Sequence, residues 1–406
     1  MLTTLIYRSL MSPDFQQDCL HTLVDEALGK NNACHVTGVL LFDGSAFFQV
    51  LEGEESVINA LFGRISADMR HGSVVQLMQD YAAYRRFHDT GMRLFDLRSQ
   101  TADAILEDIR TLSHFRGDCP QDDRIFRFVM TFLAYRGRHT IPAEFSALQW
   151  DREGKELFTL TQWPHRDPEH PCQFALQPIV EALTGRISSY EALIRSPSGA
   201  SPAEMFESVP VDRLYNFDLE TKAYAFMLGG RMLKCSEKLS VNLLPGVLHS
   251  VPGAVATLIK QIRAAGLRPD QVIIEVTETE VITEPRAFYQ ALKELRIAGI
   301  GLAIDDFGAG YSGLTLLARF QPDKIKIDMA LIEDIHISGV KQAIVRAIVQ
   351  CCDDLGIHVV AEGVEKMEEW CWLEFAGIHL FQGFLFSRPS LNDVGHIRWP
   401  VRIQAT

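Results

Sequence analysis

Long hydrophobic runs are missing from this chain of 406 residues. No stretch of about 18 or more apolar residues is present, so the sequence predicts no membrane-spanning helix. The first residues, Met1 to Arg8, lack the basic start and the long apolar core of a secretion signal. A chain of this length exceeds what one hydrophobic core usually supports, and we therefore expect two domains.

Basic residues are scarce relative to acidic ones, since 39 Lys and Arg oppose 52 Asp and Glu and leave a formal net charge of -13. Such an acidic surface disfavours binding to DNA or RNA duplexes, which requires a basic patch. The 8 cysteines include no Cys-x-x-Cys pair. This scatter argues against a disulfide scaffold or a thiolate zinc site, and it fits the reducing cytoplasm, where we expect the protein to act.

The first hundred residues alternate between β-rich runs and amphipathic helical patterns. Strands are expected over residues 3–9, 35–42, 46–51, 74–81 and 92–94, with helices over 12–29 and 57–69. The order β-α-β-β-α-β-β predicts a small sheet with two helices on one face, which is an α+β, ferredoxin-like layout.

Polar residues interrupt these apolar patterns at Tyr7, Asn31-Asn32, Gln49, Arg64 and Asp68. In one interpretation they are ordinary surface residues: the asparagines end a helix, Gln49 faces solvent, and Arg64 pairs with Asp68 one turn later. In the other, two helices and a sheet hold a flat ring whose edge is hydrogen-bonded by the amides and the phenol. The pattern alone favours the first interpretation.

Taken together, these positions resemble the BLUF family of blue-light sensors, and the resemblance covers about residues 1–95. It implies a flavin, FAD, bound between the two helices by Tyr7, Asn31, Asn32, Gln49, Arg64, Asp68 and Met92. In this family pattern Gln49 bridges the flavin and Tyr7, and Met92 passes the light signal outward. An amide suits that place because it offers a donor at one end and an acceptor at the other. The segment contains no Gly-x-Gly-x-x-Gly, so the flavin is not expected to bind in the Rossmann manner.

Residues 96–171 are predicted to connect the two domains. Helical spacing over 102–113 and 124–135 predicts two short helices, which serve either as a transmission element or as passive packing. The stretch 149–171 is rich in Trp, Pro, His and charge, a composition typical of an inter-domain joint.

From about residue 172 to 406 the chain alternates strands and helices, which predicts an α/β, modified TIM barrel. The expected strands are 174–177, 187–194, 239–243, 272–276, 301–304, 324–327, 357–361 and 379–381. A turn at Thr184-Gly185 makes a hairpin of the first two strands, so the first strand is expected to run antiparallel to the rest.

Acidic and amide side chains recur at or near the ends of these strands: Glu191, Asn242, Glu275, Asp305, Asp306 and Glu362, with Lys326 beside them. Barrel enzymes place their chemistry at the C-terminal mouth of the strands, so these groups are expected to converge. Five carboxylates repel one another unless cations are bound, and oxygen ligands favour Mg²⁺ or Mn²⁺. Two such ions that share Asp305 suit the hydrolysis of a phosphodiester.

Three members of this set also have ordinary structural interpretations. Asp305 and Asp306 lie in the stretch 301–314 before glycines, and adjacent aspartates there are common in turns and helix caps. Lys326 lies in the alternating run 324–328, where it and the lysine at 324 could simply pair with Asp323 and Asp328. The other acids favour the functional interpretation of all three residues. Lys326 would then act as a base or a water-orienting group, and bound cations would lower its pKa.

The motifs of this half resemble the EAL family of cyclic di-GMP phosphodiesterases over about residues 172–400. They are Gln177-Pro-Ile, Tyr190-Glu-Ala-Leu-Ile-Arg, Val241-Asn, Ile274-Glu-Val-Thr-Glu, Asp305-Asp-Phe-Gly, Lys324-Ile-Lys-Ile-Asp, Ala361-Glu-Gly-Val-Glu and Gln382-Gly. The resemblance implies a first metal on Glu191, Asn242, Glu275 and Asp305 and a second on Asp305, Asp306 and Glu362. It also implies catalytic roles for Lys326, Glu191 and Gln382, substrate contacts for Gln177, Arg195 and Glu365, and a loop-bracing role for Glu278. Ala309 and Gly313 depart from the family, where Thr and Ser are common.

The predicted function is a blue-light-regulated phosphodiesterase that converts cyclic di-GMP to linear pGpG by a two-metal mechanism, as a homodimer through its EAL domain. The loop 307–314 is our candidate for the element through which light reaches the metals. Two alternatives stay open. One is a catalytically weak EAL domain that acts as a light-dependent cyclic di-GMP-binding or protein-interaction regulator, and the other is flavin redox sensing in place of light sensing.

Overall fold

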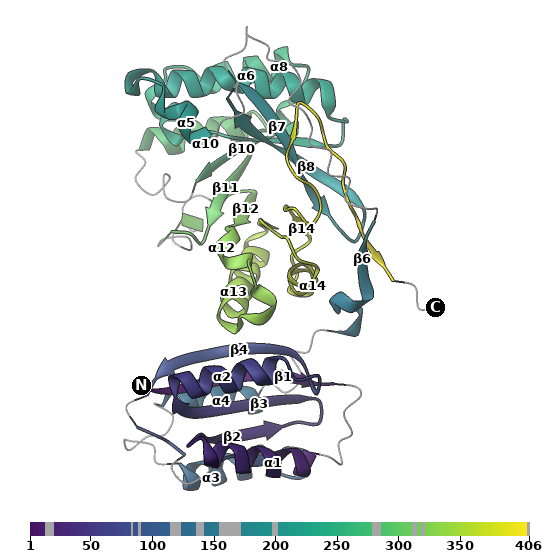
Figure 1. Cartoon of the computed structure of the whole chain (residues 1–406). Coiled ribbons are helices and arrows are strands. Elements are labelled where there is room, and N and C mark those ends of the chain that lie inside the picture. The colour runs from purple at the N-terminus through teal and green to yellow at the C-terminus, as the bar shows by residue number, and fades with distance from the viewer. Residues whose placement is uncertain are drawn as a thin grey trace. The chain divides into compact units, whose positions relative to one another are not determined.

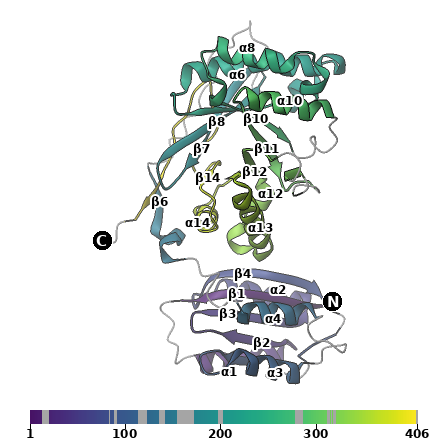
Figure 2. The ribbon, with the colours of Figure 1, turned by 180° about the vertical axis from the view of Figure 1, so that it is seen from behind.

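The computed structural model describes residues 1–12, 20–82, 84–87, 91–113, 123–134, 142–153, 172–196, 202–277, 286–310, 314, 316–317 and 321–403 (Figures 1 and 2). It separates into two compact units, Met1–Ile141 with Asp334–Ala343 and Pro142–Glu333 with Ile344–Thr406. Within the described ranges, no helix has both the length and the apolar character needed to cross a membrane.

The first unit is built on a five-stranded sheet with the order β4-β1-β3-β2-β5. β1 runs antiparallel to β3 and β4, and β2 runs antiparallel to β3 and parallel to β5. The predicted α+β, ferredoxin-like layout is therefore confirmed. Its elements are β1 (Leu2–Met11), α1 (Leu20–Ala33), β2 (Thr37–Phe42), β3 (Ala46–Glu54), α2 (Glu55–Ser66), β4 (His71–Tyr81), β5 (Arg93–Asp96), α3 (Ala102–Leu112) and α4 (Arg124–Ala134).

Helices cover both faces of this sheet. Tyr7 and Leu51 point toward the face covered by α2, where they pack with Ile58. Their strand neighbours point the other way, and Phe48 packs against α3 and α4 with its ring stacked on Phe132 at a centroid distance of 4.9 Å. The two helices predicted for the connector are thus part of the sensor core. The predicted joint lies largely outside the described residues, which resume at 172.

The second unit is a barrel of strands in the order β7-β8-β9-β10-β11-β12-β13-β14, closed by pairing of β14 with β7 (Figure 1). β7 is antiparallel to both neighbours, whereas the pairs from β8 to β14 are parallel. Gly185 has φ 66°, a left-handed conformation that suits the β7–β8 hairpin. Both the barrel and the reversed first strand are therefore confirmed.

The barrel strands are β7 (Gln173–Glu181), β8 (Arg186–Arg195), β9 (Lys238–Asn242), β10 (Val272–Thr277), β11 (Gly301–Phe307), β12 (Lys324–Ile327), β13 (His358–Ala361) and β14 (Leu380–Phe381). The α-helices around them are α5 (Pro202–Glu207), α6 (Leu214–Met232), α7 (Pro245–Ser250), α8 (Ala254–Ala264), α10 (Arg286–Ile297), α12 (Met329–Ile332), α13 (Gly339–Leu355) and α14 (Met367–Phe375). Short strands β6 (Trp150–Arg152) and β16 (Pro400–Arg402) pair with each other, and β15 (Ser390–Leu391) pairs with β7.

Short 3-10 turns complete the described structure. They are η3 (Ala143–Phe145), η4 (Ala147–Gln149), η5 (Val211–Arg213), η6 (Pro269–Gln271) and η7 (Ile335–Ile337). The barrel strands are apolar and covered by helices on the outside, so their polar side chains are left for the inside and the mouth.

Candidate active site and flavin site

Acidic side chains converge at the C-terminal ends of the barrel strands. In register, Glu275 on β10 lies opposite Asn242 on β9, and Thr277 lies opposite Asp305 on β11. Glu191, Glu275 and Asp305 each offer a carboxylate oxygen, and these oxygens lie within 4.8 Å of one another. Asp305, Asp306 and Glu362 form a second such group. Asp305 is shared by the two groups, as the sequence predicted for the bridging ligand.

Lys326 lies at the centre of this constellation on β12, with 1% of its surface exposed. Its Nζ lies 3.0 Å from Glu191 Oε2, 2.9 Å from Glu275 Oε2, 2.9 Å from Asp305 Oδ1 and 2.6 Å from Glu362 Oε1. One ammonium therefore faces four carboxylates. The interpretation in which the two lysines only pair with Asp323 and Asp328 is wrong for Lys326, because its ammonium contacts four other carboxylates. Asp328 instead caps α12 by accepting a hydrogen bond from the Ala330 N–H.

The negative charges of the carboxylates around Lys326 exceed its single positive charge. Burial raises the pKa of Glu275 to about 7, and it also raises the pKa of Glu362 well above its ordinary value, in both cases against the pull of Lys326. Burial opposes the charged form of Lys326, but the four carboxylates outweigh it and hold the lysine pKa well above 10.5. Lys326 is thus a firmly charged donor, and the expectation that it acts as a base with a lowered pKa gains no support from these groups.

Asp306 reaches the mouth through an unusual backbone conformation. Successive strand residues normally point to opposite faces, so Asp305 and Asp306 should diverge. Asp306 instead has φ 53°, in the left-handed region, and the β11–β12 register shifts between Ile304 and Phe307. Aspartate tolerates this conformation better than most residues. This irregularity brings a carboxylate oxygen of Asp306 into the group with Asp305 and Glu362.

Amide side chains hold Glu191 in place. Asn242 Nδ2 donates to Glu191 Oε1 at 2.8 Å, and Gln382 Nε2 donates to Glu191 Oε2 at 2.7 Å and to Gln177 Oε1 at 3.1 Å. Burial pushes the pKa of Glu191 upward, but Lys326 and these amides hold it below its ordinary value. The side-chain oxygen of Gln382, Oε1, is buried and has no hydrogen-bond partner within the described structure. It is therefore an unsatisfied acceptor beside the acids.

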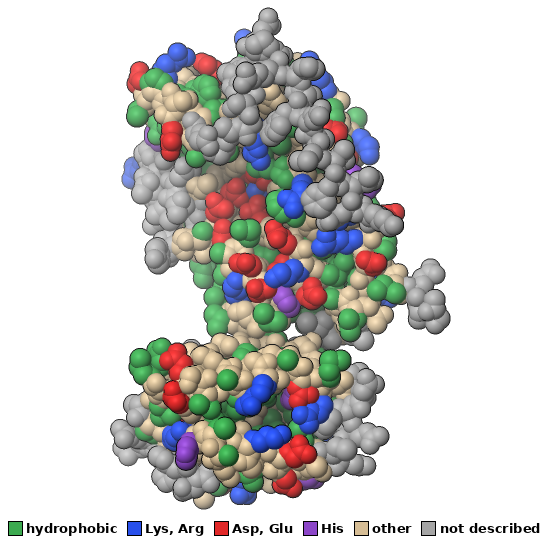
Figure 3. All heavy atoms as spheres, in the orientation of Figure 1, with side chains coloured by type: hydrophobic (Ala, Val, Ile, Leu, Met, Phe, Trp, Pro, Cys, Tyr) green, Lys and Arg blue, Asp and Glu red, His purple; other side chains and the backbone are tan. Residues whose placement is uncertain are grey.

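A cavity of about 290 Å³ opens onto these groups, where acidic side chains gather in a hollow of the barrel unit (Figure 3). Its lining includes the predicted residues Gln177, Glu191, Asp305, Lys326, Glu362, Glu365 and Gln382. Leu193, which lies within the motif at 190–195 but had no assigned role, also lines it. Sequence reasoning missed Met329 and Phe384, which line it too. Their signal was proximity, since each lies within three residues of a motif residue.

Four predicted residues that the structure describes are not part of this lining: Asn242, Glu275, Asp306 and Arg195. Arg195 Nη1 donates to the carbonyl oxygen of Ile194 at 2.8 Å. Its contact with substrate stays a prediction. Glu278 lies outside the described residues, as does much of the loop 307–314, so the bracing and signalling roles given to them stay predictions too.

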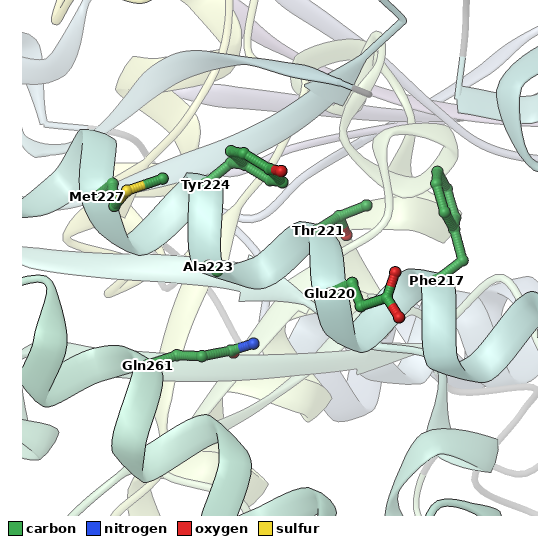
Figure 4. A pocket seen from close by; sticks show the side chains of 7 residues that line it. All are labelled: Phe217, Glu220, Thr221, Ala223, Tyr224, Met227 and Gln261. Carbon is green, nitrogen blue, oxygen red and sulfur yellow. The ribbon is translucent and has the colours of Figure 1, made fainter. Parts of the chain in front are cut away.

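A second hollow, of about 400 Å³, lies over α6 and α8 (Figure 4). It is lined by Phe217, Glu220, Thr221, Ala223, Tyr224, Met227 and Gln261. Although this hollow is the larger one, it contains a single carboxylate, whereas chemistry on a phosphodiester needs several converging charges. We therefore assign the chemistry to the smaller cavity.

The donor set fits two divalent cations. Its ligand atoms are all oxygens, which hard ions such as Mg²⁺ and Mn²⁺ prefer. The two groups of three carboxylates share one member, and Lys326 alone cannot neutralise them. Burial, together with the neighbouring carboxylates, raises the pKa values of Glu275 and Glu362, and bound cations would oppose that rise.

Metal binding is expected to weaken as the pH falls through the pKa of Glu275, which is about 7. A carboxylate must lose its proton before it binds a cation, so protons and metal compete. The rise in melting temperature caused by Mn²⁺ should therefore be larger at about pH 8 than at about pH 6. Thermal unfolding with and without Mn²⁺ at each pH measures this. Equal shifts at the two pH values would contradict the competition.

The predicted flavin residues of the first unit form a connected chain. The Tyr7 hydroxyl donates to Gln49 Oε1 at 2.5 Å, and Gln49 Nε2 donates to Met92 Sδ at 2.8 Å. Gln49 is only 5% exposed, so the interpretation that it faces solvent is wrong. Burial, followed by the charge of Asp68, raises the pKa of Tyr7 and keeps it a neutral donor. Met92 directly precedes β5 and is buried.

The remaining flavin candidates are arranged differently. Asn31 is buried in the last turn of α1, and its Nδ2 donates to the carbonyl oxygen of Gly91 at 3.0 Å. Asn32 and Arg64 are exposed. The expected surface pair of Arg64 with Asp68 is wrong, because α2 ends at Ser66 and Asp68 instead accepts hydrogen bonds from Arg70 Nε and Nη2.

A further polar pair, missed in the sequence, lies beside Tyr7. Ser9 Oγ and His71 Nδ1 are 2.8 Å apart, and the His71 ring is 6.5 Å from that of Tyr7. Burial lowers the pKa of His71. Ser9 is two residues after Tyr7 and so shares its face of β1, which was a usable signal. The position of His71 could not be read from local spacing.

Comparison with known proteins identifies the family of each part of the chain. The family model "Sensors of blue-light using FAD", BLUF, matches residues 2–93, and the EAL domain model matches residues 171–389. The chain is 42% identical over 404 residues to the "Blue light- and temperature-regulated antirepressor BluF" of Escherichia coli, covering 98% of this chain and 99% of that protein. A solved structure of BlrP1 from Klebsiella pneumoniae, a calcium and cyclic di-GMP complex, has 56% identity and a TM-score of 0.94, covering 99% of this chain and 100% of that one. A manganese complex of BlrP1 has 55% identity and a TM-score of 0.93 over the same shares. The chain therefore belongs to the EAL family and carries an N-terminal BLUF domain.

Proposed function

We propose that this protein is a blue-light-regulated phosphodiesterase that hydrolyses cyclic di-GMP to linear pGpG. The observation that carries the proposal is the pair of carboxylate groups that share Asp305 around Lys326. The similar BlrP1 structures hold cyclic di-GMP together with calcium or manganese, which supports both the substrate and the divalent ions. The domain limits proposed from the sequence are 1–95, 96–171 and 172–406.

When bound, two divalent cations would neutralise phosphoryl oxygens and acidify a water molecule. Glu191, Asn242, Glu275 and Asp305 would hold one ion, and Asp305, Asp306 and Glu362 the other. The chain's own groups then do three things. Lys326 Nζ supplies a fixed positive charge and hydrogen-bond donor among the acids. Gln382 holds Glu191 and presents its side-chain carbonyl oxygen to the site, where it can accept a hydrogen bond from the attacking water. Gln177, Arg195 and Glu365 orient the substrate in this proposal.

Light sensing is assigned to the first unit, with FAD as the cofactor that absorbs blue light. Gln49 can reverse its hydrogen bonds because its side chain carries a donor and an acceptor on one rotatable group. It contacts Tyr7 on one side and Met92 on the other, so a turn of this amide changes both contacts at once. We propose Asn31, Asn32, Arg64 and Asp68 as further flavin contacts, and Met92 as the first residue of the output path.

The proposal also includes a homodimer through the EAL domain and a cytoplasmic location. Six cysteines of the described structure are free thiols, which fits a reducing compartment. Light scattering on the purified protein measures the oligomeric state.

The turnover of cyclic di-GMP should differ between darkness and blue light in the presence of Mg²⁺ or Mn²⁺. Chromatographic measurement of pGpG gives both rates. The Gln49→Leu variant keeps the size of the side chain but removes its donor and acceptor, so we expect hydrolysis to persist and its light response to disappear. A wild-type rate unaffected by illumination would contradict light regulation, and an unchanged flavin spectrum on illumination would instead favour redox sensing.

A second function is favoured by one comparison. The similar Escherichia coli protein is described as an antirepressor, which acts through another protein. An EAL domain that only binds cyclic di-GMP or a regulator needs no complete metal site, whereas all six predicted ligands are present here. Absence of hydrolysis under every light and metal condition would leave this protein-interaction role.

A further inference from the structure

A buried ion pair lies on the inner side of α6, outside the set of predicted metal ligands. Asp218 and Lys222 are one turn apart and are 2% and 3% exposed. Lys222 Nζ donates to Asp218 Oδ1 at 2.5 Å. The outer side of the same helix lines the hollow shown in Figure 4, where Glu220 and Tyr224 lie. The pair therefore faces the barrel rather than solvent.

Stability alone does not account for this pair. Removing two charges from water is costly, and apolar side chains of similar size often stabilise a core equally well or better. The second carboxylate oxygen shows what the pair can do. Asp218 Oδ2 accepts a hydrogen bond from the backbone N–H of Leu244 at 3.0 Å. Lys222 thus neutralises one oxygen while the other holds the main chain.

The chain held in this way is the turn directly after Asn242. Leu243 N donates to the carbonyl oxygen of Glu275 at 2.9 Å, and Leu244 N donates to Asp218. The turn is therefore anchored to β10 on one side and to α6 on the other. Leu244 precedes α7 as its cap residue, and no side chain of the turn itself caps that helix.

Packing around the turn is close as well. A Cβ atom on Gly246 in α7 would lie 2.2 Å from Cζ of Tyr215 in α6, so any larger residue at 246 would have to displace this tyrosine ring. Asn242 Nδ2 donates to Glu191 Oε1, so the side-chain oxygen of Asn242, Oδ1, is the atom of this amide that can bind a metal ion. A shift of the turn would move that oxygen relative to Glu191 and Glu275.

We infer that Asp218, with Lys222 as its counter-ion, is a positioning residue for the first metal ion and acts through the Leu244 N–H on Asn242. This inference rests on the metal site of the proposed function. Groups that orient metal ligands typically change metal affinity by about 10–100-fold when they are removed. Asp218 contacts no substrate and no reacting atom in this arrangement.

The test compares two charge-free pairs by Mn²⁺ titration calorimetry on the full chain, without substrate. Asp218→Asn with Lys222→Met keeps an acceptor for the Leu244 N–H, whereas Asp218→Leu with Lys222→Met removes it. We expect the Leu pair to weaken Mn²⁺ binding by about tenfold relative to the Asn pair. Glu220→Gln on the outer side of α6 is the control and should bind Mn²⁺ as the parent does.

A backbone variant keeps the test decisive if the Leu pair does not fold. Leu244 has φ -61°, which proline adopts, so Leu244→Pro removes the donor N–H together with the half-buried leucine side chain and leaves the ion pair in place. It should also weaken Mn²⁺ binding about tenfold. If Leu244→Pro, or a folded Asp218→Leu with Lys222→Met variant, bound Mn²⁺ as tightly as the parent, the positioning role of Asp218 would be overturned. The proposed metal site itself would not be affected by that result. A parent chain that binds no Mn²⁺ would overturn the metal site and this inference together.

Discussion

Replacing Glu191 by alanine is expected to lower cyclic di-GMP hydrolysis by about a hundredfold to a thousandfold, the loss typical when one group that stabilises the transition state is removed. Glu191 accepts hydrogen bonds from Asn242, Gln382 and Lys326, so its loss affects both a ligand and the groups around it. The measurement is pGpG formation at saturating Mn²⁺, in darkness and in blue light.

The matched control is Glu220→Ala, which removes a carboxylate from the outer hollow of α6. It should keep the parent rate, because that hollow lacks a second acidic group. Both variants should unfold at temperatures near that of the parent, which separates lost chemistry from lost structure. A Glu191→Ala protein that keeps more than about a tenth of the parent rate would place the reaction elsewhere.

Replacing Lys326 by methionine should cost about 3–5 kcal/mol of unfolding free energy in metal-free buffer. The variant leaves four buried or half-buried carboxylates without their one ammonium partner. Uncompensated buried charge is strongly destabilising, even where a complete ion pair contributes little. Urea unfolding in the presence of a chelator measures the loss. Hydrolysis should be lost as well, because no other ammonium in the described structure contacts these acids.

Lys324→Met is the control for this prediction, since it lies two residues away on the same strand and is also buried. Burial lowers the pKa of Lys324 to about 8, so its charge is disfavoured in the folded chain. Its removal should therefore leave stability unchanged or raise it. Mn²⁺ should restore more stability to Lys326→Met than to the parent, because cations replace the missing charge. Equal stability of the two lysine variants would refute this account of Lys326.

Much of the barrel followed from local patterns. Apolar runs of strand length, separated by helical spacing, predicted strands that the structure contains, and β12 (Lys324–Ile327) has the predicted limits. The turn at Gly185 correctly indicated the reversed β7. The metal-ligand candidates followed from a geometric rule, because the C-terminal ends of neighbouring parallel strands meet at one mouth.

The first unit shows where local patterns mislead. The pattern favoured a solvent-facing Gln49 because one face of a small antiparallel sheet is often exposed. Here Gln49 shares the face of Tyr7 and Leu51, which α2 covers, and α3 and α4 cover the other face, so no position of β3 near Gln49 faces solvent. The helical spacing of Arg64 and Asp68 was equally misleading, because α2 ends before Asp68 and frees it to meet Arg70.

The sequence alone predicted the order of the elements, the barrel, and the acidic and amide candidates. These features could be predicted because hydrophobic periodicity and strand ends are local properties. Three decisive features could not be predicted in this way. They are the left-handed turn that brings Asp306 into one group with Glu362, the strongly held charge of Lys326, and the anchoring of the Asn242 turn by Asp218. Each depends on groups that are distant in sequence and meet only when the barrel closes, so the fields and contacts that define them exist only in the folded chain.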